Sequence, residues 1–139
     1  MAGTHPVIDA WHALVQRRDM AALSAILDDE VVFHSPVVHT PQRGKAITLQ
    51  YLRGALLVLN NASFRYERQI VGSHDAVLEF TTTIDGILIN GIDLIRWNDA
   101  GRITDFKVMV RPLKAVNLLH QKMGAMLEQL KQGQAQQQQ

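Results

Sequence analysis

The sequence contains no cysteine, and this absence excludes several kinds of site. Without a thiolate there is no disulfide framework, no cysteine nucleophile and no cysteine-ligated zinc or iron–sulfur centre. Long apolar runs are absent too, because none approaches the ~20 residues that a membrane-spanning helix needs. The opening Met-Ala-Gly-Thr-His-Pro lacks the basic start and apolar centre of a signal peptide. We therefore expect a cytoplasmic protein that does not cross a membrane.

The chain also has almost no net charge. It carries 14 Lys and Arg residues against 13 Asp and Glu residues, which gives a formal net charge of +1. Its basic residues form no stripe, so the pattern does not favour nucleic-acid binding. The 139 residues, 47% of them hydrophobic, are enough for one domain with a sizeable core. The near-equal numbers of positive and negative charges indicate a neutral or weakly charged partner.

Helical periodicity dominates the first half of the chain. Three helices are predicted, over residues 5–18, 20–27 and 46–60, and one short strand over residues 31–35. Pro6 suits the first turn of the first helix, and Thr4 or His5 can cap it. Pro36 ends the strand.

The second half has the pattern of antiparallel strands joined by tight turns. Four strands are predicted, over residues 64–71, 76–84, 87–98 and 102–111, the first of them without clean alternation. Asp85-Gly86 and Asn98 to Gly101 predict the turns of two hairpins. After Pro112 an apolar seam returns at helical spacing, through Val116, Leu119, Met123, Met126 and Leu130.

These elements predict a single domain over residues 1–131, which includes a C-terminal amphipathic helix over residues 113–131. Residues 132–139 form a Gln-rich tail that we expect to be disordered. Helices followed by a run of strands indicate an α+β fold. We expect a curved antiparallel β-sheet wrapped around three N-terminal helices, which leaves a cone-shaped cavity between them.

This order of elements resembles the nuclear transport factor 2-like superfamily, in its SnoaL-like branch of ketosteroid isomerase-like and polyketide cyclase-like cone folds. The resemblance covers roughly residues 5–113. It is carried by residues 11–19, 27–36 and 44–52 and by the hairpin over residues 91–112. The fold hosts isomerases, cyclases, epoxide hydrolases and pure binding proteins, so it does not by itself give a function.

Asp93 is the one carboxylate inside an otherwise apolar strand of this hairpin. Strand parity places it on the same face as Ile95 and Trp97. If this face lines the cone, burial raises the pKa of the carboxyl, which suits a hydrogen-bond donor or a general acid near neutral pH. The alternative is structural: Asp93 accepts hydrogen bonds from Trp11, Tyr51 or the backbone and fixes the cone.

The resemblance also implies roles by position. In ketosteroid isomerases the general base would fall at Ser35, the oxyanion-hole tyrosine at Trp11 and the oxyanion-hole acid at Asp93, so one of three groups is retained. In limonene epoxide hydrolase an arginine would fall at Gly91 and a second acid at Val108, so that set is incomplete as well. The single acid/base aspartate of the polyketide cyclases matches Asp93. Cyclase chemistry is therefore the enzyme chemistry that the sequence least contradicts.

The expected ligand-binding walls of the cone are Trp11, Phe33, Ser35, Tyr51, Ile95, Trp97, Phe106 and Val108. His34 should face away from the cone, and His39 lies in the loop at its mouth. This pair lacks a third ligand, so we expect no metal and no other cofactor. The outer sheet face, where the superfamily usually dimerises, predicts a homodimer, with Lys107, Met109 and Arg111 facing outward.

Three functions remain open at this point. We prefer binding of a small apolar or carbonyl-containing ligand in a pocket centred on Asp93, because no second strong acid, base or nucleophile accompanies that residue. The second is a cofactor-independent cyclase, isomerase or hydratase with Asp93 as acid/base. The third is a homodimeric interaction module that uses the C-terminal helix.

Overall fold

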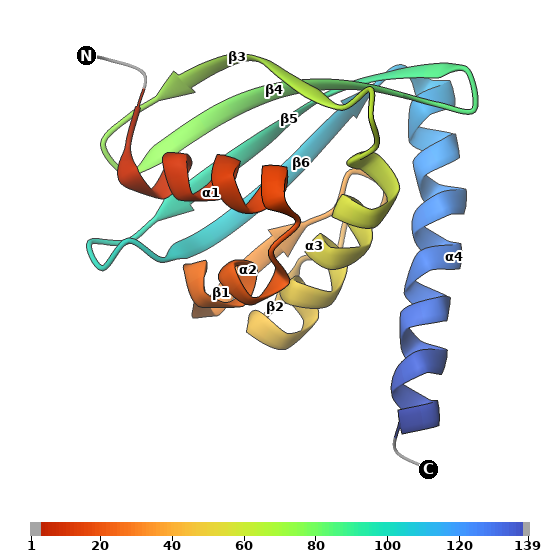
Figure 1. Cartoon of the computed structure of the whole chain (residues 1–139), viewed down its shortest axis with the longest axis horizontal. Helices are drawn as coiled ribbons and strands as arrows, with labels where there is room; N and C mark the ends of the chain where they lie inside the picture. Colours follow the sequence, from red (N-terminus) through yellow and green to blue (C-terminus); the bar gives the residue numbers. More distant parts are fainter. Residues whose placement is uncertain (1–3, 138–139) are drawn as a thin grey trace.

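The computed structural model describes residues 4–137, and the side chains as far as residue 132. The elements are α1 (Pro6–Arg17), α2 (Met20–Ile26), β1 (Leu27–His34), β2 (Gln42–Arg43), α3 (Lys45–Leu59), β3 (Arg65–Val71), β4 (Asp75–Ile84), β5 (Ile87–Trp97), β6 (Ile103–Arg111) and α4 (Leu113–Gln137). The strands form one curved sheet in the order β2-β1-β6-β5-β4-β3. Helices α1 to α3 lie against one face of it, and α4 stands beside α3 (Figure 1). This is the predicted α+β architecture.

Strand β1 is longer than predicted and runs parallel to β6, whereas all other neighbours in the sheet are antiparallel. It begins at Leu27 because α2 passes into it without a loop: the residue that ends α2 already has extended backbone angles. Leu27 is fully buried and pairs with Ile103. The pairing is irregular between Leu27 and Val32, so the acidic run between them can remain at the surface.

Strand β3 contains a bulge that explains its irregular sequence pattern. Tyr66 pairs with Phe80 and Arg68 pairs with Glu79, which are neighbours on β4, so Glu67 is the extra residue. Tyr66 and the buried Phe80 therefore lie on the inner face of the sheet. The side chains of residues 64–71 therefore do not alternate strictly between the two faces of the sheet.

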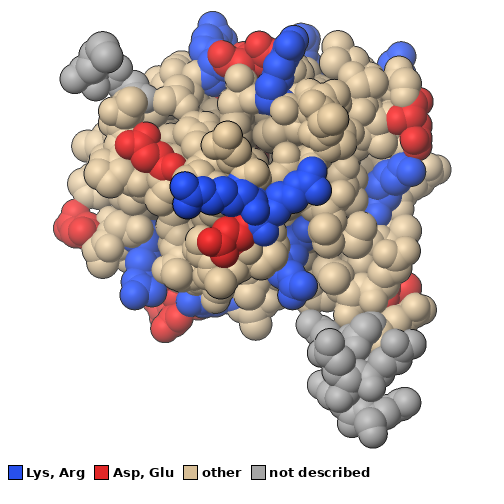
Figure 2. Space-filling view, viewed as in Figure 1, with Lys and Arg blue, Asp and Glu red and all other residues tan. Residues whose placement is uncertain are grey.

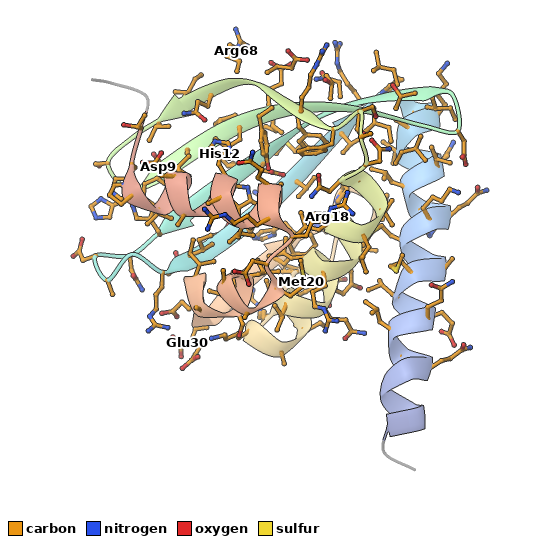
Figure 3. The ribbon with its side chains drawn as sticks, in the orientation of Figure 1. Asp9, His12, Arg18, Met20, Glu30 and Arg68 are labelled. Carbon is orange, nitrogen blue, oxygen red and sulfur yellow. The ribbon has the colours of Figure 1, made fainter. Side chains whose placement is uncertain are left out.

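Helix α1 forms and docks as its sequence predicts. His5 caps it, since its Nδ1 accepts a hydrogen bond from the Val7 backbone N–H at 3.1 Å. On the side towards the sheet, His12 Nε2 lies 2.8 Å from Gln69 Oε1 of β3 (Figure 3). At the C-terminal end the Arg18 guanidinium donates to the Asn60 carbonyl, which joins the ends of α1 and α3 (Figure 3).

Helix α4 packs closely on α3 through Gly54. A Cβ at Gly54 would lie 3.2 Å from Met123 Cε and 3.7 Å from Leu127 Cδ2, so the missing side chain lets the two helices approach. The helix continues to Gln137, beyond the end at residue 131 that the sequence predicts. Residues 138–139 of the predicted tail lie outside the described residues.

The inner face of the sheet and the helices bury the apolar core, whose largest fully buried side chains include Trp11, Phe33, Phe80 and Phe106. On the face shown in Figure 2, Lys and Arg side chains occur in small groups with Asp and Glu between them. Among the described residues, no helix is both long and apolar enough to cross a membrane.

Candidate functional site

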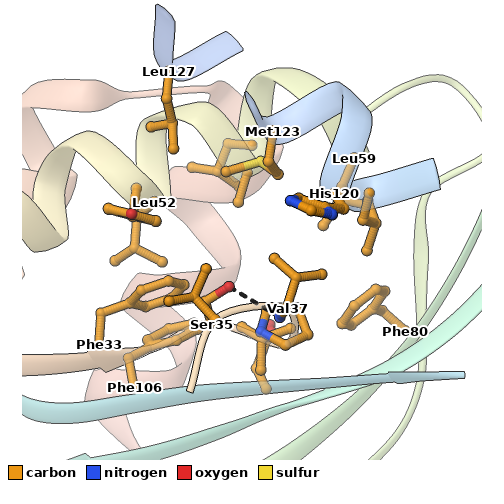
Figure 4. A pocket seen from close by; sticks show the side chains of 18 of the residues that line it. Phe33, Ser35, Val37, Leu52, Leu59, Phe80, Phe106, His120, Met123 and Leu127 are labelled. Atoms are coloured by element: carbon orange, nitrogen blue, oxygen red, sulfur yellow. Dashed lines mark hydrogen bonds between the residues drawn. The ribbon is translucent and has the colours of Figure 1, made fainter. Parts of the chain in front are cut away.

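A cavity of about 210 Å³ lies between the sheet and the helices α3 and α4 (Figure 4). From α3 it is lined by Leu52, Ala55, Leu56 and Leu59, and from α4 by Leu119, Met123 and Leu127. Phe80, Phe106 and Val108 line it from the sheet. A dry cavity of ~150 Å³ lined by such side chains is large enough for benzene. This cavity therefore has room for a larger, bicyclic ring system.

A chain of three polar side chains interrupts the apolar wall. Asp93 is 6% exposed and sits in the middle of the sheet, between Leu78 of β4 and Val108 of β6. Its Oδ2 accepts a hydrogen bond from the Tyr66 hydroxyl at 2.7 Å. The same hydroxyl accepts a hydrogen bond from Trp11 Nε1 at 2.9 Å. The chain thus connects three elements that are far apart in the sequence: Trp11 of α1, Tyr66 of β3 and Asp93 of β5.

Burial changes the acidity of both titrating groups. It raises the pKa of the Asp93 carboxyl from its ordinary value of 3.8 to about 7, and the hydrogen bond from Tyr66 opposes part of this rise. Burial, followed by the charge of Asp93, raises the pKa of the Tyr66 hydroxyl well above its ordinary value. At neutral pH Tyr66 is therefore protonated, and Asp93 is present in both protonation states.

Asp93 retains hydrogen-bonding capacity in this arrangement. Its second oxygen, Oδ1, makes no hydrogen bond to any residue of the described part of the chain. Protonated, the carboxyl can donate a hydrogen bond to a carbonyl oxygen; ionised, it can accept one from a hydroxyl group or take up a proton. The arrangement thus suits both binding and proton transfer.

Seven of the nine predicted site residues line the cavity: Trp11, Phe33, Ser35, Tyr51, Asp93, Phe106 and Val108. Ile95 and Trp97 do not, although both are buried on the same face of β5 as Asp93. The reason is the position of α1: at this end of β5 the ring of Trp97 packs against His5, with 4.6 Å between centroids. The N-terminal end of α1 thus covers this part of the face.

Ser35 and Tyr51 are present at the cavity but neither contacts Asp93 by a hydrogen bond. The Ser35 hydroxyl accepts a hydrogen bond from the Val37 backbone N–H at 3.1 Å (Figure 4). The Tyr51 ring packs on Phe33, with 5.5 Å between centroids, and its hydroxyl has no partner within the described residues. Tyr66 is the direct donor to Asp93, and Trp11 acts one step further away.

Two residues with polar side chains that line the cavity, Tyr66 and His120, were not among the predicted site residues. The bulge at Glu67 hid the inward orientation of Tyr66, but a simple signal existed. A buried carboxylate needs a donor, and the chain has only two tyrosines, Tyr51 and Tyr66. His120 was missed because the apolar seam of the last helix does not say which part of the domain that helix covers.

The remaining polar candidates lie elsewhere. His34 Nε2 lies 3.1 Å from Asp105 Oδ2, and His39 is exposed and does not line the cavity. No cluster of three or more His, Asp or Glu that could hold a metal ion exists in the described part of the chain. Gly91 has no room for an arginine, since even a Cβ there would lie 2.6 Å from Phe80 Cζ and 2.7 Å from the Met109 carbonyl oxygen.

Comparisons with known proteins agree with this architecture. No curated protein sequence matches the chain significantly. Among solved structures, a steroid delta-isomerase from Pseudomonas aeruginosa is similar, with 36% identity, a TM-score of 0.84 and coverage of 89% of this chain and 90% of the other. An uncharacterised protein with a cystatin-like fold from Silicibacter pomeroyi has 32% identity and a TM-score of 0.81, over 88% and 86% of the two chains.

A more distant structure shares the fold alone. It is an NTF2-like protein of unknown function from Mesorhizobium loti, with 21% identity and a TM-score of 0.66 over 76% and 88% of the two chains. The sequence model of the SnoaL-like domain matches residues 8–106, which run from within α1 into β6 and contain the Trp11–Tyr66–Asp93 chain. The chain belongs to the SnoaL-like domain family.

Proposed function

We propose that the cavity binds a small, mostly apolar molecule through one oxygen atom, which forms a hydrogen bond with Asp93. The observation that carries this proposal is the combination of one buried carboxyl, with an oxygen left without a protein partner, and walls that are otherwise largely apolar. Ligand sites are typically apolar with a few well-placed polar groups that fix orientation.

The chemistry of the cavity narrows the ligand class. An anion next to Asp93 is unfavourable, because burying a second negative charge there without a counter-charge is costly. A neutral carbonyl or hydroxyl group is suitable, since Asp93 can donate or accept according to its protonation state. The ligand is therefore a ring or chain compound that carries a neutral carbonyl or hydroxyl group at the Asp93 end.

Paired probes test this proposal. 2-Naphthol carries a hydroxyl group where 2-methylnaphthalene carries a methyl group of similar size, so fluorescence titration of both measures the contribution of the oxygen. We expect the wild type to bind 2-naphthol about ten-fold more tightly, the size of one good hydrogen bond. Asp93→Leu should lose this preference and still bind 2-methylnaphthalene. Equal binding of the two probes by the wild type would refute the proposal.

A second candidate function is proton transfer of the isomerase type. Two observations favour it: burial brings the pKa of Asp93 to about 7, and a solved relative with 36% identity is a steroid delta-isomerase. A base with a pKa near the working pH is effective in both taking up and returning a proton. Asp93 is the only carboxylate that lines the cavity among the described residues, so it would have to serve as the base.

In the proposed reaction, Asp93 moves one proton between two carbon atoms of the substrate. The Asp93 carboxylate removes a proton from the carbon between a carbonyl and a C=C bond, and the C–H electron pair enters the conjugated enolate. Asp93 then returns the proton to the far carbon, so that the double bond moves into conjugation with the carbonyl. Conversion of a β,γ-unsaturated ketosteroid, followed by the ultraviolet absorbance of the conjugated product, tests this. No turnover by the wild type, or equal turnover by Asp93→Asn, would reject it.

We also propose that the outer sheet face joins two copies of the chain. Three large apolar side chains on this face are exposed to solvent: Ile70 is 64%, Leu88 59% and Met109 49% exposed. Sedimentation velocity of the wild type and of Met109→Glu tests the proposal. A dimer that the substitution weakens supports it, and a monomeric wild type at high micromolar concentration contradicts it.

A further inference from the structure

The C-terminal helix supplies the wall of the cavity that faces the sheet. Leu119, Met123 and Leu127 form the apolar part of this wall, and His120 adds an imidazole to it (Figure 4). The match to the family ends at residue 106, before α4 begins at Leu113. The imidazole of His120 therefore comes from a part of the chain that the family match does not cover.

His120 and Asp93 occupy different depths of the same cavity. Asp93 is almost completely buried at the sheet, whereas His120 lines the cavity and is also exposed to solvent. One turn further along α4, a Cβ at Gly124 would meet no other segment within 4 Å, although Gly124 lines the cavity as well. The cavity thus opens to solvent along this side of α4, and His120 stands at the opening.

The imidazole of His120 is free to bind a ligand. It forms no hydrogen bond or ion pair with any described residue. By contrast, the hydroxyl of Ser35, also on the cavity, already accepts a hydrogen bond from the backbone N–H of Val37. The cavity walls from α3 are formed by Leu52, Ala55, Leu56 and Leu59 together with the ring of Tyr51. The cavity therefore has Asp93 at the sheet and His120 at its opening, within a largely apolar lining.

Resting on the binding function proposed above, we infer that His120 binds a second polar group at the outer end of the ligand. An imidazole N–H donates a hydrogen bond, so this group is an acceptor, and an anion is the strongest one. The ligand class becomes an elongated apolar molecule with a hydroxyl or carbonyl group at the inner end and a carboxylate or similar acceptor at the outer end. The outer end lies near solvent, so its charge keeps part of its hydration.

Probes with one or two polar ends test this inference. 2-Naphthol has only the inner hydroxyl group, while 6-hydroxy-2-naphthoate and the longer 4′-hydroxybiphenyl-4-carboxylate add a carboxylate at the far end. We expect at least one of the two-ended probes to bind the wild type about ten-fold more tightly than 2-naphthol. His120→Ala should remove this gain, so that the variant binds the two-ended probes no more tightly than it binds 2-naphthol. Gln121→Ala, an exposed neighbour that does not line the cavity, is the matched control.

A spectroscopic readout separates a direct contact from a packing effect. The imidazole ¹H–¹⁵N resonances of His120 should shift on addition of the two-ended probe and not on addition of 2-naphthol. The inference is overturned if both two-ended probes bind no more tightly than 2-naphthol, or if His120→Ala weakens all probes equally. If 2-naphthol itself does not bind the wild type, the binding function fails first, so the two failures can be told apart.

Discussion

The hydroxyl of Tyr66 and the carboxylate of Asp93 meet at 2.7 Å, although their strands β3 and β5 are separated by β4. The contact depends on the bulge at Glu67, which leaves Tyr66 on the inner face, paired with Phe80. It also depends on Gly91, which pairs with Phe80 and leaves room for its ring. Features of the three adjacent strands β3, β4 and β5 thus hold the Asp93 carboxylate in place in the apolar cavity.

The raised pKa of Asp93 predicts a specific loss of stability with rising pH. The unfolded chain releases this proton near pH 4, whereas the folded protein keeps it up to about pH 7. Between these values the folded state binds more protons, so stability falls as pH rises through this window and levels off above it. A difference of this size corresponds to at most about 4 kcal/mol.

Asp93→Asn isolates this contribution, because the amide keeps an acceptor for Tyr66 and does not titrate. We expect the stability of the variant relative to the wild type to increase from pH 4 to pH 7, as measured by urea unfolding at each pH. Asp29→Asn, at an exposed carboxylate, is the control and should show no such trend. Parallel curves for Asp93→Asn and the wild type would show that Asp93 titrates normally.

Tyr66→Phe should raise the pKa of Asp93 above 7, since the hydrogen bond that favours its ionised form is lost. It should also cost about 1–3 kcal/mol of stability at pH 8, because the ionised carboxylate and the indole N–H of Trp11 lose their buried partner. The titration of the Asp93 carboxyl ¹³C resonance measures the pKa directly. Tyr51→Phe removes a hydroxyl without a described partner and should leave that titration unchanged.

Replacing either of two glycines by alanine should change the stability of the protein, in opposite directions at the two positions. Gly91→Ala should destabilise the protein by more than about 2 kcal/mol, because its Cβ would collide with backbone as well as with Phe80. Gly124→Ala should stabilise it by about 0.5–1 kcal/mol, since Gly124 lies within α4 and a Cβ there has open space. Thermal unfolding of both variants checks this pair, and a stable Gly91→Ala protein would refute the close packing at Phe80.

Local chemistry predicted the parts of the fold that depend on neighbouring residues. Pro6 and the His5 cap start α1, and the Asp85-Gly86 turn joins β4 to β5 with both residues at positive φ. The same local rule placed Asp93 on the inner face, because strand alternation in β5 is regular from Ile89 to Trp97.

The parts that the sequence did not predict depend on contacts between distant segments. The bulge in β3 is a property of its pairing with β4, so Tyr66 could not be oriented from alternation alone. Ile95 and Trp97 have the right parity for the cavity, but α1 covers that end of β5. His120 joins the cavity only because α4 docks at Gly54.

We propose Asp93 as the polar anchor of a ligand-binding cavity. The most direct measurement is the carboxyl ¹³C spectrum of Asp93 during titration with 2-naphthol at pH 7, where the carboxyl is in both protonation states. We predict that the resonance moves with a saturating dependence on 2-naphthol and that the exposed Asp29 carboxyl does not respond. Saturable binding of 2-naphthol with an unchanged Asp93 resonance, or no binding at all, would contradict the claim.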